Sequence, residues 1–124
     1  MPTPSCEADC ERLAVSDPAA LVAAFPAMRP TLLTFAAEYL GRAPADVAVP
    51  ALLPLLDHPK AYVREGALYG LMQCDDPRAV AAILRAAEHD PSEAVRTIAR
   101  EWRDYEPHAT PDPPPRGPSV TLKL

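Results

Sequence analysis

Residues 52–71 read LLPLLDHPKAYVREGALYGL, and this stretch decides the fold. On either side of the turn residues Asp57, His58 and Pro59, apolar side chains recur at steps of three and four, the spacing of a buried helix face. A linker this short makes successive helices run antiparallel. The stretch therefore predicts a helix, a tight turn and a second helix that packs back against the first.

The same pattern recurs in AAEHDPSEAVRTIA at residues 86–99. Four identities share an offset of 32 residues: Pro59 and Pro91, Val63 and Val95, Arg64 and Arg96, Ala67 and Ala99. A weaker copy lies 31 residues before the middle one, with three equivalent pairs: Leu32 and Val63, Ala36 and Ala67, Leu40 and Leu71. One helix pair cannot bury its apolar stripe alone, so a repeat of this length predicts three stacked helix–turn–helix units.

Prolines punctuate the predicted helices, because proline is well tolerated at the first helical position. Asp17, Asp76 and Asp90 each precede a proline and are expected to cap the helix that follows. Pro50 is expected to open the third helix, and Pro54 to bend it. Six helices are expected over residues 17–25, 30–41, 49–57, 60–73, 77–89 and 91–104, with a short additional helix over 5–15.

These residues resemble the HEAT-repeat family, including its short form named after phycobilisome lyases. The apolar run at 52–56, the turn at 57–59 and the run at 63–71 match the usual repeat of that family closely. The resemblance covers residues 17–104. It implies an all-α fold, an α-solenoid of about three stacked antiparallel helix pairs forming a right-handed superhelix, and a main role in holding protein partners.

Three parts are expected along the chain. Residues 1–16 form an N-terminal leader with room for a short helix, and residues 17–105 form the HEAT-like repeat domain. Residues 106–124 hold six of the 17 prolines and are expected to be a solvated tail, since this composition favours polyproline II or coil. A Pro-rich ligand and a docking strand at 119–124 are the alternatives for the tail. The units of the repeat domain are expected at about 17–43, 44–74 and 75–105.

Charge and composition argue against several classes of function. The 124-residue chain has 12 basic and 17 acidic residues and a net charge of −5, which disfavours binding to nucleic acid. No apolar run reaches the roughly 20 residues of a membrane span, and the first residues do not have the pattern of a signal peptide. Three cysteines are too few for a disulfide framework. A cytoplasmic protein is expected, and its arginine, alanine and proline bias favours a bacterial source.

The most informative expected surface is the outward row of the second helices, which lines the concave side of a HEAT-like stack. Its charges are all acidic, and carboxylates steer partners with a basic surface. Its two tyrosines supply contact area of the kind enriched at binding hot spots. An ordinary solvated helix face is the alternative. The repeat register assigns these residues to the row: Thr34, Glu38, Tyr62, Glu65, Tyr69, Gln73, Thr97, Glu101 and Asp104.

The resemblance also implies a structural ladder, in which arginines of the second helices pair with turn aspartates of the adjacent unit. Arg64 and Arg96 are the arginines of this kind, and Asp57 with Arg96 is the expected pair. A ligand-binding role for the two arginines is the alternative.

The two turns also hold weak candidates for a metal site, namely Asp57, His58, His89 and Asp90. Imidazoles and carboxylates suit zinc or iron. Deoxyhypusine hydroxylase, a HEAT-like enzyme family, binds two irons through His-Glu dipeptides, but this chain has only the reversed order, with Glu88 before His89. Asp90 is also explained as a helix cap, so neither a metal nor a cofactor is expected.

Other singular residues are expected to be structural. Cys6 and Cys10 lie one helical turn apart and are expected to be reduced thiols facing the first repeat. Cys74 is expected to be packed in the place of a repeat leucine. Trp102 is expected to close the end of the stack.

Three hypotheses for function follow. The chain has no Ser/His/Asp set, glycine-rich phosphate loop or nucleotide motif, so the first is a non-catalytic interaction module or scaffold that binds a protein partner on its acidic, tyrosine-containing concave face. The second is an immunity-type inhibitor of a basic bacterial toxin domain. The third is a HEAT-like lyase or a metal-binding member.

Overall fold

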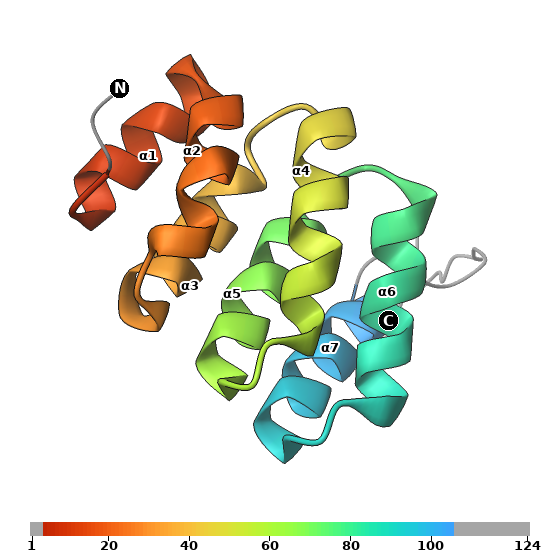
Figure 1. Cartoon of the computed structure of the whole chain (residues 1–124). Coiled ribbons are helices and arrows are strands. Elements are labelled where there is room, and N and C mark those ends of the chain that lie inside the picture. The colour runs from red at the N-terminus through yellow and green to blue at the C-terminus, as the bar shows by residue number, and fades with distance from the viewer. Residues whose placement is uncertain (1–3, 106–124) are drawn as a thin grey trace, which may run out of the picture.

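The described part of the chain, residues 4–105 of the computed structural model, is made of helices and the short turns between them (Figure 1). The tail expected over residues 106–124 lies outside the described residues. The elements in chain order are α1 (Glu7–Ser16), α2 (Pro18–Ala24), the 3₁₀ helix η1 (Phe25–Ala27), α3 (Pro30–Leu40), α4 (Ala45–Leu52), the 3₁₀ helix η2 (Leu53–Asp57), α5 (Ala61–Met72), α6 (Pro77–His89) and α7 (Glu93–Tyr105).

The helices stack in two layers that alternate along the chain (Figure 1). Helices α1, α3, α5 and α7 pack in sequence to form one layer, called the inner layer below. Helices α2, α4 and α6 form the outer layer, and each packs against the inner helix that follows it. The three antiparallel pairs are therefore α2 with α3, α4 with α5, and α6 with α7. This arrangement confirms the predicted all-α solenoid of stacked helix pairs.

Helix α1 extends the inner layer by one helix beyond the three pairs. It packs against α3 and buries Cys10 and Ala14. Its first turn is held by Asp9, whose carboxylate accepts the backbone N–H of Ser5 at 3.1 Å and pairs with Arg12. The Ser5 hydrogen bond and the Arg12 guanidinium lower the pKa of Asp9 to about 2. Helix α1 is thus part of the stack.

A single apolar core runs through both layers. Burial of whole aliphatic side chains supplies most of the stabilisation of such a core, about 1.5–3 kcal/mol for each. Trp102 belongs to it and is 8% exposed. The largest fully buried side chains are Leu21, Leu40, Val49, Leu52, Val63, Leu68, Leu71, Ile83 and Val95.

Helix α4, which corresponds to the helix expected over residues 49–57, begins earlier than predicted from its prolines. It starts at Ala45, so Pro50 lies inside α4 and does not open it. The carbonyl of Pro44 accepts the first helical hydrogen bonds instead. At Pro54, where a bend was expected, the α-helix has already given way to the 3₁₀ helix η2. Pro50 and Pro54 are both exposed, so carbonyls that lose a helical partner to them can bond water.

The predicted start of the last helix, at residue 91, was also wrong. Asp17 and Asp76 cap α2 and α6 as predicted, accepting backbone N–H groups at 3.2 and 2.8 Å. Asp90 has no such role, because α7 begins only at Glu93 and the hydroxyl of Ser92 accepts the N–H of Val95. Within residues 4–105, no helix has the length and apolar character to span a membrane.

Candidate functional site

The residues predicted for the concave row lie on α3, α5 and α7 of the inner layer, except Gln73, which directly follows α5. All of those named below are exposed except Glu65, which is half-buried. We call this surface the inner face. It consists of Glu38, Tyr62, Glu65, Tyr69, Gln73, Thr97, Glu101 and Asp104.

Exposed large apolar side chains lie on inner-layer helices alone within residues 4–105. Tyr62 and Tyr69 on α5 are 39% and 41% exposed, and Phe35 on α3 is 42% exposed. Val15 on α1 and Tyr105 on α7 complete the set. Isolated apolar residues are common on protein surfaces, but in the described part of the chain the outer-layer helices carry none of this size.

Carboxylates from three neighbouring helices act on Tyr69. Partial burial and the negative charges of Glu65, Glu38 and Glu101 together raise the pKa of its phenol above the usual value of 10. These glutamates belong to α5, α3 and α7, so the stack brings residues from three repeats to bear on one ring. The phenol is neutral at physiological pH, and the potential around it is negative.

Close approach of α3 and α5 makes this convergence possible. A Cβ on Gly66 would come closer than 3.0 Å to the carbonyl oxygen of Thr34, and a Cβ on Gly70 would meet that of Ala37 in the same way. Glycine at both positions therefore lets the two backbones touch. Tyr69, between these glycines in sequence, is held on the solvent side of the contact.

Two of the residues assigned to the concave row hold the helices together. The hydroxyl of Thr34 donates to the carbonyl of Tyr62 at 2.7 Å. The side-chain amide of Gln73 donates to the carbonyl of Glu38 at 2.8 Å, and more weakly to that of Tyr69 at 3.3 Å. Because their polar groups are engaged between α3 and α5, both residues fix the spacing of the inner face.

Sequence reasoning missed Phe35. It follows Thr34, and its equivalent at an offset of 31 residues is Gly66, which is buried. The repeat register therefore gives Phe35 the place of a buried glycine, and the predicted concave row did not include it. The signal that would have found it is the size of the side chain, since phenylalanine cannot occupy a place where two backbones touch.

The arginines near the end of α7 are exposed at the open end of the stack or paired with acidic residues. Arg100 is the equivalent of buried Leu68 at an offset of 32, but no described helix packs beyond α7. It is therefore exposed at the open end of the stack. Arg103 pairs with Glu88 at 3.3 Å and with Asp104 at 3.2 Å. Helices α3 and α5 carry no exposed basic residue.

The ladder pairing differs from the predicted one. Asp57 is exposed and makes no ion pair with Arg96 within the described residues. Arg64 instead donates to both carboxylate oxygens of Asp90, at 3.0 and 3.3 Å, and to the carbonyl of His58 at 2.8 Å. The predicted direction was wrong because the arginine of one unit reaches forward to the turn of the next.

Both charges of this pair are buried. The side chains of Arg64 and Asp90 are only 9% and 4% exposed. Asp90 also accepts the N–H of Ser92 at 2.8 Å, and its carbonyl accepts Arg96 at 2.6 Å. The pair links α5 to the turn before α7, so it joins the second repeat to the third.

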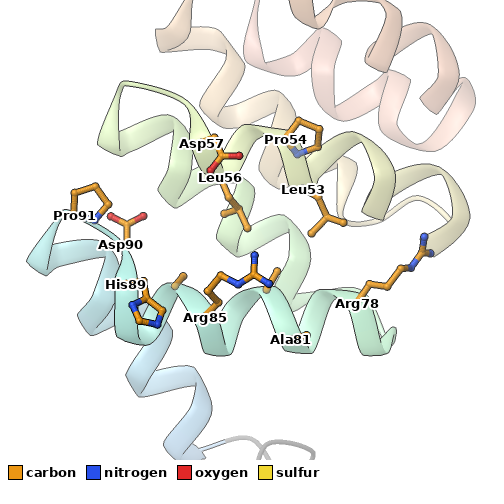
Figure 2. A pocket seen from close by; sticks show the side chains of 12 residues that line it. Leu53, Pro54, Leu56, Asp57, Arg78, Ala81, Arg85, His89, Asp90 and Pro91 are labelled. Atoms are coloured by element: carbon orange, nitrogen blue, oxygen red, sulfur yellow. The ribbon is translucent and has the colours of Figure 1, made fainter.

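A groove of about 740 Å³ lies in the outer layer between η2 and α6 (Figure 2). It is the second candidate site, and three of the four metal candidates line it: Asp57, His89 and Asp90. The fourth is engaged locally, because Nδ1 of His58 accepts the N–H of Lys60 at 3.0 Å. The other residues that line the groove are Leu53, Pro54, Leu56, Arg78, Ala81, Ala82, Arg85, Ala86 and Pro91.

The charges in the groove do not form a ligand set. Arg64 neutralises Asp90, and Arg78 is bonded by Asp76 at 3.1 Å. The remaining charged residues of the groove are Arg85 and Asp57, which make no ion pair among the described residues. Their charges are opposite and sum to zero. Within residues 4–105, no group of three or more His, Cys, Asp or Glu side chains is placed to hold a metal ion. The groove thus offers apolar walls without a net charge to select a ligand.

The cysteines do not add a further site. Burial raises the pKa of the Cys10 thiol to about 11, and burial likewise raises that of Cys74. Both thiols are therefore protonated and unreactive at neutral pH. Cys6 is exposed.

Comparison with known proteins agrees with the architecture. The family model described as HEAT repeats matches residues 18–101 of the chain. No curated protein matches the chain, and no solved structure matches it. The matched segment begins in α2 and ends in α7, and so includes all three helix pairs.

Proposed function

Because the chain belongs to the HEAT-repeat family, whose members are generally protein-interaction scaffolds, we propose that it is a non-catalytic module that binds a protein partner through the inner face. Stacked repeats present an extended surface of this kind for partners to contact. The observation that carries the proposal is the confinement of exposed tyrosine and phenylalanine to inner-layer helices.

The partner has a basic surface. The charges at the centre of the inner face are the carboxylates that raise the pKa of Tyr69. Such a field speeds the capture of a positively charged partner and repels acidic ones. Tyrosine rings among carboxylates then supply the apolar contact area on which affinity depends. An inhibitor of a basic toxin domain is a special case of this proposal, because the same face would capture the toxin.

Affinity capture from a lysate of the source organism tests the proposal, with the full chain as bait. The variant Tyr62→Ala/Tyr69→Ala is expected to lose bound partner by more than about tenfold, since truncated hot-spot residues each cost about 2 kcal/mol or more. The matched control is Arg85→Ala, because Arg85 is exposed on the outer layer.

Salt supplies an independent arm of the test. Capture by the wild-type chain should weaken as salt rises from about 0.1 M to about 0.5 M, because exposed charges are screened over shorter distances. Unchanged recovery with the tyrosine variant, or selective loss with Arg85→Ala, would rule out the inner face as the binding surface.

A further inference from the structure

Helix α5 occupies the centre of the inner face, with α3 on one side and α7 on the other. Its exposed tyrosines, Tyr62 and Tyr69, are seven residues apart, which places them about 10.5 Å apart along the helix axis. Two turns of a partner helix span the same distance. Side chains at positions i and i+7 of that helix can therefore meet both rings at once.

We infer that the inner face recognises an α-helix of its partner that carries arginines at positions i and i+7, with each guanidinium stacked on one tyrosine ring of α5. This inference rests on the proposed function and specifies the chemistry of the partner. It also sets the direction of docking, because the partner helix must lie along α5 to reach both rings.

A cation is favoured because of the surroundings of Tyr69. The carboxylates of Glu38, Glu65 and Glu101 that disfavour a phenolate at this position attract a positive charge beside the ring. The ring itself, half-exposed and neutral, presents a negative π-face to a cation. Both effects act on the same small volume, so a cationic side chain gains from each.

Arginine fits this place better than lysine. A guanidinium is planar, stacks on an aromatic ring and can at the same time bond carboxylates in its own plane. The negative charges of glutamates on α3, α5 and α7 all act on Tyr69, so carboxylate partners for such a guanidinium are available on three helices. An ammonium group is a more strongly hydrated point charge and gives up more hydration when it leaves water.

Within residues 4–105, the arginine that stacks on a tyrosine is Arg42, and its ring is Tyr39 and neither Tyr62 nor Tyr69. Helices α3 and α5 have no exposed basic residue within residues 4–105. Arg42, just after α3, is held elsewhere, bonded to Glu11 at 3.1 Å and stacked on Tyr39 at 4.9 Å. The stacking of Arg42 on Tyr39 shows that this chain already uses the arginine–tyrosine contact inferred for the partner.

Synthetic helical peptides test the inference directly against the full chain. Three alanine-based peptides are compared by isothermal titration calorimetry, with arginine, lysine or glutamine at positions i and i+7. The arginine peptide is expected to bind about tenfold more tightly than the lysine peptide, as the stronger stacking of a guanidinium allows. The glutamine peptide should not bind measurably.

Variants of the chain locate the contact. Tyr69→Leu keeps the apolar bulk but removes one π-face, and should reduce the preference for arginine over lysine, whereas Tyr62→Leu/Tyr69→Leu should abolish it; circular dichroism should show unchanged helix content in both variants. Glu101→Gln should weaken both cationic peptides, and Arg85→Ala in the outer layer should weaken neither.

The outcomes separate the inference from the proposed function. Equal binding of the arginine and lysine peptides, still dependent on the two tyrosines, overturns the arginine inference and leaves a basic partner in place. Failure of all peptides overturns the inference, while the lysate capture still decides the proposed function. A dimer of the chain alone that Tyr62→Ala/Tyr69→Ala abolishes would make a second copy the occupant, and would also overturn the inference.

Discussion

Asp90 connects the second repeat to the third through several bonds at once. Its carboxylate pairs with buried Arg64 and accepts the N–H of Ser92. Removing one partner of a buried pair leaves an uncompensated charge, which costs far more than the pair contributes when intact. Asp90 is therefore expected to contribute most of the stabilisation that the ladder between the second and third repeats provides.

We expect Asp90→Ala to lower the free energy of unfolding by about 3–5 kcal/mol, because it strands the Arg64 charge in a buried site. Asp57→Ala, at the exposed aspartate of the preceding turn, is expected to change it by less than about 0.5 kcal/mol. Urea unfolding followed by circular dichroism measures both. Similar values for the two variants would contradict the Arg64–Asp90 pairing.

Tyr69 reports the electrostatics of the inner face. Any one of Glu38→Gln, Glu65→Gln or Glu101→Gln is expected to lower the pKa of the Tyr69 phenol toward 10, since each removes a negative charge that opposes its ionisation. Titration of the ring Cζ resonance by NMR measures it. Asp104→Asn is the matched control, because Asp104 is not among the charges that act on this phenol.

The same shift makes a prediction for stability. The pKa of Tyr69 is higher in the folded state than in the unfolded state. The contribution of Tyr69 to the free energy of unfolding is therefore fully present below about pH 10, and it is lost as the pH rises through the pKa of the folded state. As the pH rises above about 10, Tyr69→Phe should therefore lose less stability than the wild type. A tyrosine titrating at its usual pKa would contradict the clustering of carboxylates around it.

At the scale of elements, the helices could be predicted from sequence because their apolar spacing is regular and Asp17 and Asp76 cap as expected. The boundary near Pro50 was wrong because a proline at an exposed helix position is tolerated. The predicted pairing of Asp57 with Arg96 was wrong because the residue types in a turn do not reveal which neighbouring turn an arginine side chain reaches. That depends on the stacking of the repeats, which has no signature within one repeat.

The contact between α3 and α5 depends on glycine. Gly66→Ala is expected to destabilise the chain by about 1–3 kcal/mol, because the added Cβ would be forced against the Thr34 carbonyl. This is opposite to the gain of about 1 kcal/mol that alanine gives over glycine in an open helix. Thermal unfolding measures the sign, and a rise in the melting temperature would mean that the two backbones are not in contact.

At the scale of the whole molecule, the two layers have different surfaces. The inner layer carries the exposed aromatic side chains and the carboxylates around Tyr69, and the outer layer carries a groove without net charge. The acidic row was predicted from repeat register, since register fixes which positions of successive helices align. The convergence of three glutamates on one ring required the packed structure.

NMR mapping of the captured partner on the isotope-labelled full chain tests the central claim most directly. Binding through the inner face predicts that the largest shift changes on adding the partner fall at exposed positions of α3, α5 and α7, centred on Tyr62 and Tyr69. Largest changes along η2 and α6, around Arg85 and His89, would place the partner in the outer groove and contradict the account.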